Sequence, residues 1–157
     1  SILKNVQTIR LSHNDYSQWH SFVQANCEDF ISNQYNGYNI KNDKASVGLA
    51  YICDKAIKEN RKIYLSGQGA DEIFSDYGMF GTKIMGDQQS TFGGIYPEDL
   101  SLYFPWKNFF DGTMEMYIAK EEYVAGSFGI ETRYPYLDKN VVQEFLWLTP
   151  EFKQIAI

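Results

Sequence analysis

The stretch KIYLSGQGADE, residues 62–72, carries the strongest structural signal in this chain. The short apolar run 63–65 predicts a buried strand, the small residues that follow predict a tight turn, and two carboxylates predict the start of a helix. A strand that leads through a glycine turn into a helix presents main-chain N–H groups and partial positive charge to an anion. We therefore expect an anion-binding site at the carboxyl end of this strand.

The turn supplies candidates for nucleotide binding, and the carboxylate after it is a candidate metal ligand. Because Gly67 and Gly69 have no Cβ, they leave room for a phosphate against the main chain. Asp71 could hold a divalent metal that bridges phosphate oxygens. A purely structural reading stays open, in which the turn only reverses the chain and Asp71 and Glu72 stabilise the helix dipole by about 0.3–1 kcal/mol each. The candidate nucleotide-binding residues are Ser66, Gly67, Gln68 and Gly69.

Composition limits the classes of protein that fit. The chain has 157 residues, 44% of them hydrophobic, which predicts one compact domain with a packed core. Its formal net charge of −6 argues against a nucleic-acid partner, which would require a basic face. Cys27 and Cys53 show no disulfide or zinc spacing, so a reducing cytoplasm is expected. No apolar run approaches the roughly 20 residues that span a bilayer.

Hydrophobic periodicity predicts alternating strands and helices. Strands are expected at 6–11 and 63–65, helices at 14–31, 45–59, 100–110, 114–128 and 139–148, and irregular segments at 33–43 and 77–94. Asn14 or Asp15 is placed to cap the first helix, and Asp138 lies at the start of the last. The order strand–helix–helix–strand is typical of a parallel sheet with helical crossovers.

Two separated motifs resemble those of a known family. LSGQGADEIF, residues 65–74, resembles the second nucleotide motif of the asparagine synthase family. GIETRYPYLD, residues 129–138, resembles that family's G-x-E-x-R-x-P-F-L-D segment, and it is followed by a predicted helix, Pro150 and Lys153. The resemblance extends from the predicted strand at 6–11 to Lys153 and is thinnest between 79 and 115.

This resemblance implies a fold and an activity. The implied fold is α/β: a Rossmann-like parallel sheet flanked by helices, of the adenine nucleotide alpha hydrolase-like or ATP-pyrophosphatase kind, incomplete, with a helical C-terminal part. Residues 1–157 would form one truncated synthetase domain. Such enzymes use ATP and Mg²⁺ to adenylate a small-molecule carboxylate, here aspartate, and ammonia or an amine then displaces AMP to form an amide. By position, Ser66 and Gly67 would contact the nucleotide and Asp71 would bind Mg²⁺, and the supporting residues would be Glu72, Glu131, Arg133 and Asp138, with Glu131 and Arg133 as a buried pair.

The sequence departs from the family pattern in two ways. The family's Ser-Gly-Gly-x-Asp-Ser loop, its glutaminase domain with an N-terminal cysteine, and a lysine beyond Lys153 are not found. We therefore expect an internal fragment of a longer enzyme, inactive in isolation, whose exposed sheet edge favours homo-oligomers. Gln68 stands where asparagine synthetases have glutamate and β-lactam synthetases have tyrosine.

The residue at position 68 leaves the catalytic base and the reaction open. A carboxamide cannot accept a proton as a general base does. Either the base lies elsewhere, or the parent protein makes a different amide, or Gln68 only hydrogen-bonds the acyl-adenylate. Two alternatives to an asparagine-forming enzyme remain: a non-catalytic homologue that acts as a scaffold, and a β-lactam or peptide-cyclising synthetase.

Overall fold

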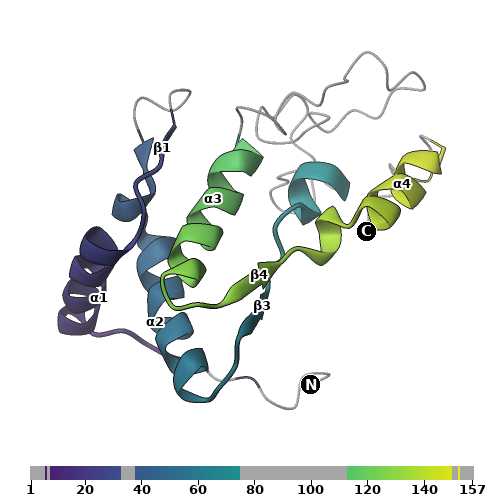
Figure 1. The fold of residues 1–157 in the computed structure, drawn as a ribbon. Coiled ribbons are helices and arrows are strands. Elements are labelled where there is room, and N and C mark those ends of the chain that lie inside the picture. Colours follow the sequence, from purple (N-terminus) through teal and green to yellow (C-terminus); the bar gives the residue numbers. More distant parts are fainter. Residues whose placement is uncertain (1–5, 7, 33–37, 75–112, 150–151, 153–157) are drawn as a thin grey trace.

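The computed structural model describes residues 6, 8–32, 38–74, 113–149 and 152, in which short strands alternate with helices (Figure 1). In chain order the elements are α1 (His13–Asn26), β1 (Ile31–Ser32), β2 (Tyr38–Asn39), the 3₁₀ turn η2 (Ile40–Asn42), α2 (Lys44–Lys58), β3 (Ile63–Leu65), the π-helical turn η3 (Ala70–Phe74), α3 (Thr113–Gly126), β4 (Glu131–Arg133), the 3₁₀ turn η5 (Pro135–Leu137) and α4 (Lys139–Trp147). A mixed α/β class, predicted from the sequence, is confirmed at this level.

Two helix–strand units with the same type of connection lie at the centre of the fold. Helix α2 leads to β3, and α3 leads to β4. Each helix ends through a residue in the left-handed region, Asn60 at φ 57° and Gly129 at φ 69°. The amide of the next residue then bonds to the carbonyl five residues earlier, at 2.9 Å after α2 and 3.1 Å after α3. This Schellman-type ending turns both strands back along their helices in the same way.

The two strands pair in parallel, with Tyr64 opposite Thr132 and Leu65 opposite Arg133. Tyr64 is half-buried and Thr132 is buried, so this face of the sheet is covered by helices. The other face is open in the described part of the chain, because Ile63 and Leu65 are 52% and 65% exposed. The strand at 63–65 was therefore predicted correctly, but the prediction that it is buried was wrong.

The hydrophobic core lies between α1, α2, α3 and the start of β4 (Figure 1). Its buried residues come from each of these elements: Val23, Cys27, Leu49, Ala50, Cys53, Val124, Ala125 and Ile130. Aromatic rings extend it toward the end of α3, where Phe22 and Phe128 stack with centroids 4.9 Å apart. Both cysteines are free and buried in this core. The predicted absence of a disulfide thus agrees with the structure.

The N-terminal region differs from the sequence prediction. Residues 6 and 8–11 are not a strand, since no described strand lies beside them to complete a ladder. The cap of α1 is Ser12 rather than Asn14 or Asp15. Its hydroxyl accepts from the Asp15 amide at 3.2 Å, and the Asp15 carboxylate accepts from the Ser12 amide at 2.9 Å. This capping box places the cap two or three residues earlier than predicted, and the helix ends at Asn26 rather than 31.

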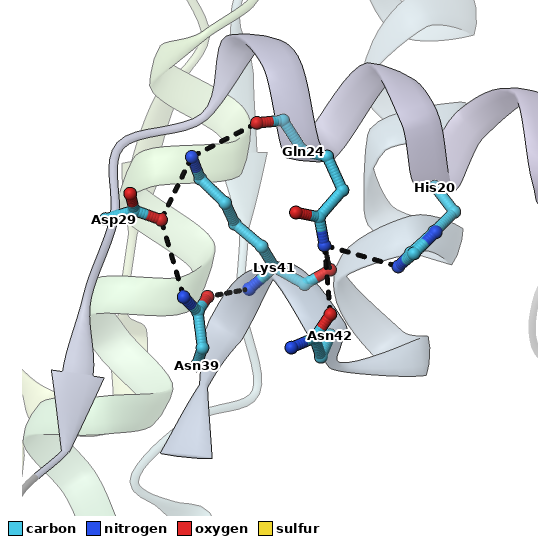
Figure 2. A network of polar contacts seen from close by, with 6 residues as sticks. All are labelled: His20, Gln24, Asp29, Asn39, Lys41 and Asn42. Carbon is cyan, nitrogen blue, oxygen red and sulfur yellow. Dashed lines mark hydrogen bonds and ion pairs between the residues drawn. The ribbon is translucent and has the colours of Figure 1, made fainter. Parts of the chain in front are cut away.

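A polar network ties the segment after α1 back onto that helix (Figure 2). The Gln24 side-chain nitrogen donates to the Lys41 carbonyl at 3.0 Å, and the Lys41 ammonium donates to the Gln24 carbonyl at 3.2 Å. The same ammonium pairs with Asp29 at 3.0 Å. In the predicted loop 33–43, the described residues instead form β2, which pairs antiparallel with β1, and the turn η2. Residues 33–37 lie outside the described part.

The remaining helix predictions can be compared only where the structure describes the chain. Helices at 45–59, 114–128 and 139–148 are confirmed as α2, α3 and α4, with ends shifted by at most two residues. The predictions for 77–94 and 100–110, and for Pro150 and Lys153, fall outside the described residues. Among the helices within the described ranges, none combines the length and the hydropathy needed to cross a bilayer.

Candidate functional site

The bend at residues 66–69, called the bend below, follows β3 directly. The Ser66 amide continues the ladder by donating to the Arg133 carbonyl at 2.9 Å. The Ser66 hydroxyl accepts from the Gln68 amide at 3.1 Å, and the Ala70 amide donates to the Gly67 carbonyl at 3.3 Å. Three amides of this region are thus bonded within the protein. The bend therefore offers fewer main-chain donors to an anion than the sequence pattern predicts.

The two glycines of the bend have different surroundings. Gly67 is exposed, and a β-carbon built on it meets no atom within 4 Å. Gly69 has φ +95°, and a β-carbon there would overlap Leu137, whose Cγ lies 2.8 Å from that position. The absence of a side chain leaves open space at Gly67, as predicted. At Gly69 the prediction of room for a phosphate was wrong, because Leu137 fills that space.

The segment after the bend is a short π-helical turn rather than a regular helix. In η3 the Ile73 amide donates to the Gly69 carbonyl at 3.1 Å, and Ile73 is fully buried. Burial of the Ile73 side chain favours this turn, because it removes apolar surface from water. The side chains of Asp71 and Glu72 lie outside the described part. Magnesium binding by Asp71 consequently stays a prediction.

The structure adds a residue that the sequence analysis did not single out. Glu121, from the middle of α3, is only 7% exposed, and its Oε1 accepts from the Gln68 side-chain nitrogen at 3.2 Å. Its second oxygen, Oε2, is buried with no hydrogen-bond partner in the described part of the chain. Thr132 Oγ1 on β4 is also buried, and it has no hydrogen-bond partner in the described part of the chain. An acidic side chain thus lies directly behind the bend.

Tyr64 and Ser66 belong to the same polar group. Burial raises the pKa of Tyr64, the negative charge of Glu121 raises it further, and a hydrogen bond with Ser66 opposes the shift. Ser66 is itself only 5% exposed. The sequence did contain a signal for Glu121, because it is three and four residues from the core residues Val124 and Ala125 and so shares their face of the helix.

A partly buried ion pair lies next to Glu121 along α3. Lys120 Nζ is 3.3 Å from Asp43 Oδ2, and the two side chains are 11% and 16% exposed. Asp43 also caps α2 by accepting from the Ala45 amide. Lys120 lies over the ring of Tyr117, 4.9 Å from its centroid. The cation nearest to Glu121 in sequence is therefore engaged with another carboxylate.

The predicted supporting residues differ in what they do. Arg133 Nε and Glu131 Oε1 form an ion pair at 2.7 Å, but the side chains are 56% and 61% exposed. The prediction of a buried Glu–Arg pair was therefore wrong, because both side chains point to the open face of the sheet. The contact with Glu131 raises the pKa of Arg133. Asp138 caps α4, accepting from the Asn140 amide at 2.9 Å.

The segments 65–74 and 129–138, separate in sequence, meet beyond the carboxyl ends of β3 and β4. Parallel pairing places their strands side by side (Figure 1). Beyond the strands, the Phe74 ring lies 5.8 Å from that of Tyr136 and 4.8 Å from that of Phe145. Together with the contact of Gly69 and Leu137, these rings pack the turn η3 against η5 and α4.

A separate surface hollow lies along α2. It encloses about 740 Å³ and is lined by the segment before α1 and by the outer side of α2, with Ile9, Ile52 and Lys55 among its residues. None of the bend residues lines it. Nothing in the sequence pattern predicted this hollow, whose lining includes the ion pair of Arg61 and Glu59 at 2.9 Å.

Among the described residues, no group of three or more histidine, cysteine, aspartate or glutamate side chains could hold a metal ion. Comparison with protein-family models, with curated proteins and with solved structures finds no match to this chain. The residues of the bend and their neighbours are therefore the observations that bear on function.

Proposed function

We propose that the chain is the synthetase part of an ATP-dependent amide-forming enzyme of the asparagine synthase kind. Such an enzyme joins AMP to a carboxylate, of which aspartate is the first candidate, and releases pyrophosphate. Ammonia or an amine then displaces AMP. The observation that carries the proposal is that segments 65–74 and 129–138 pack together beyond the carboxyl ends of two adjacent parallel strands. Ligands of α/β sheets bind at this edge.

The open side of the bend is where a nucleotide fits. Gly67 is exposed, and a β-carbon built on it would have no other atom within 4 Å. Phosphates can therefore approach the main chain there. Ser66 is held in place behind it by its bonds to Gln68 and Arg133. The bend is thus rigid on one side and open on the other, which favours preorganised binding of a charged group.

Magnesium would be held near the bend by Asp71, the carboxylate that follows it in sequence. A bound Mg²⁺ ion supplies positive charge to phosphate oxygens and takes only one or two protein carboxylates in such sites. Residues of the chain itself would position the substrate: the main chain of the bend approaches the phosphates, and the Gln68 side chain links the bend to Glu121.

A second function, a non-catalytic scaffold of the same fold, is favoured by a different observation. The amides of Ser66, Gln68 and Ala70 are already bonded within the protein. A glutamine at position 68 also provides no base. A scaffold would keep the packing of η3 against η5 and α4 without binding a nucleotide.

Nucleotide titration distinguishes these two functions. We expect the protein to bind ATP in a magnesium-dependent way, measured by isothermal titration calorimetry with and without Mg²⁺. In Asp71→Ala the magnesium dependence is expected to disappear, because the metal loses its protein carboxylate. Glu131→Ala is the matched control, since it removes an exposed carboxylate from the open face of the sheet. No ATP binding by the wild type would favour the scaffold, and identical magnesium dependence in wild type and Asp71→Ala would count against Asp71 as the metal ligand.

A further inference from the structure

We propose that the hollow along α2 binds a small amphipathic carboxylate, in which a medium-length aliphatic chain carries one carboxylate group. The hollow lies between the segment before α1 and the outer side of α2, and none of the bend residues lines it. Its volume of about 740 Å³ is within the usual range of small-ligand sites, roughly 300–1,000 Å³. This site is separate from the one proposed for the nucleotide.

Helix α2 has two faces, and only one of them packs into the core. Leu49, Ala50 and Cys53 are buried in that core. The α2 residues that line the hollow recur every three or four positions, so they form one stripe on another side of the helix. They are Gly48, Tyr51, Ile52, Lys55, Ala56 and Glu59. Ile52 is 51% exposed, so the stripe presents an apolar side chain to the hollow rather than to the protein interior.

Gly48 leaves a notch in this stripe. Glycine is unfavourable in the interior of a helix, because it loses more backbone freedom on folding than other residues do. A β-carbon built on Gly48 would have no other atom within 4 Å, so packing within the described part of the chain does not require a glycine here. The missing side chain instead allows a ligand in the hollow to approach the surface of α2 closely.

The second wall of the hollow comes from the segment before α1. Its side chains in the lining are Val6, Ile9 and Leu11. Val6 is 66% exposed and Ile9 is 38% exposed. Apolar surface therefore lies on both walls of the hollow, on this segment and at Ile52. An aliphatic chain bound between the walls would remove that surface from water, which favours binding.

Lys55 gives the hollow its positive charge. Its Nζ lies 5.8 Å from the centroid of the Tyr51 ring, in the same lining. Within the described ranges no carboxylate forms an ion pair with Lys55, whereas Arg61 pairs with Glu59 at 2.9 Å. One cation of the lining is thus left for an anionic ligand. The helix rise places Lys55 roughly 10 Å along α2 from Gly48, a distance that a medium-length chain spans.

The test measures binding of sodium octanoate to the purified protein by isothermal titration calorimetry. Sodium acetate is the control for the carboxylate alone, and 1-octanol is the control for the chain alone. We expect saturable octanoate binding, with acetate at least about tenfold weaker and 1-octanol at least about threefold weaker, because each lacks one of the two contacts. No saturable octanoate binding by the wild type, or equally tight binding of 1-octanol, would overturn the proposal.

Two lysine variants test the charge. Lys55→Gln removes the cation from the hollow and should weaken octanoate binding about threefold or more. Lys58→Gln is the matched control on the same helix, because Lys58 pairs with Asp54 at 2.6 Å and does not line the hollow. Its octanoate affinity should equal that of the wild type. The same affinity in both variants would contradict the role of Lys55 and overturn the proposal.

Two further variants test the apolar part of the site. Gly48→Leu fills the notch and should weaken octanoate binding at least about tenfold, with an unfolding midpoint no lower than that of the wild type. If this variant does not fold, Ile52→Ser serves instead, with Ile31→Ser as its control, since Ile31 is 57% exposed and lies outside the hollow. Wild-type affinity in folded Gly48→Leu, or in Ile52→Ser, would overturn the proposal.

Sedimentation velocity distinguishes a ligand from a second copy of this chain as the occupant of the hollow. We expect Gly48→Leu to leave the sedimentation coefficient of the protein unchanged. If the wild type is a dimer and Gly48→Leu is a monomer, the hollow is an interface between copies. That result would overturn the assignment of a small carboxylate.

Discussion

Leu137 occupies the space that a β-carbon on Gly69 would need. These residues lie 68 positions apart, in the two segments whose sequences resemble motifs of one family. Their contact means that the glycine is required by packing as well as by its φ of +95°. Leu137 thereby fixes how the bend sits against η5, and with it the position of Gln68.

Alanine substitution should separate the two glycines of the bend. Gly69→Ala is expected to lower the free energy of unfolding by about 2–4 kcal/mol, because it combines an unfavourable φ with overlap at Leu137. Gly67→Ala should change it by less than about 0.5 kcal/mol, since a β-carbon there meets nothing within 4 Å. Urea denaturation followed by circular dichroism measures both. Equal effects would show that Leu137 does not pack on Gly69, and Leu137→Ala should relieve part of the cost.

The ion pair of Asp43 and Lys120 gives a second prediction. Asp43→Ala should lower the free energy of unfolding by about 3 kcal/mol, because α2 loses its cap and Lys120 is left buried without its partner. Asp54→Ala is the control. The Asp54 carboxylate pairs with Lys58 at 2.6 Å, and the lysine side chain is exposed to solvent. This ion pair should contribute less than about 0.5 kcal/mol to the free energy of unfolding. If the two variants lose the same unfolding free energy, the stabilising role assigned to Asp43 would be contradicted.

The buried thiol of Cys53 predicts a pH dependence. Burial raises the pKa of Cys53 to about 11. In the unfolded chain the thiol ionises at lower pH, so its contribution to stability is present below about pH 9 and is lost as the pH rises toward 11. The contribution is up to about 2–3 kcal/mol.

Comparison with a variant isolates this contribution from other groups that titrate at high pH. The difference in unfolding free energy between wild type and Cys53→Ala should shrink as the pH is raised from 8 to 11, measured by urea denaturation. The protein should also react slowly with iodoacetamide at pH 8, because both thiols are buried and uncharged. A difference that is constant with pH would mean that Cys53 is accessible in the folded state.

Local signals predicted much of the fold. The helices α2, α3 and α4 follow from apolar periodicity, and Asp138 was recognised as a helix start because its side chain can accept from the first amides. The strand β3 follows from its apolar run. The strand expected at 6–11 is not formed by residues 6 and 8–11, because a loosely alternating pattern forms a strand only when a partner strand lies beside it.

The site was predicted only in part. Residues 66–69 do form a bend at the end of a strand, but the environment of each glycine depends on Leu137, a contact that local sequence does not encode. Glu131 and Arg133 were expected to be buried, yet alternation along β4 puts them on the open face opposite to Thr132. Glu121 was missed because a glutamate on a helix is normally a solvent-facing residue. Its burial depends on the packing of α3 in the tertiary structure, which the local sequence does not encode.

The most direct test of the central claim is the affinity for Mg-ATP of wild type and Gly67→Val, measured by calorimetry. A larger side chain at Gly67 projects into open space, so the fold should be preserved, with an unfolding midpoint close to that of wild type. If the open side of the bend receives phosphates, the account predicts Mg-ATP binding by wild type and at least about tenfold weaker binding by Gly67→Val, as for loss of close main-chain approach. Equal affinity of the two folded proteins, or no binding by wild type, would contradict it.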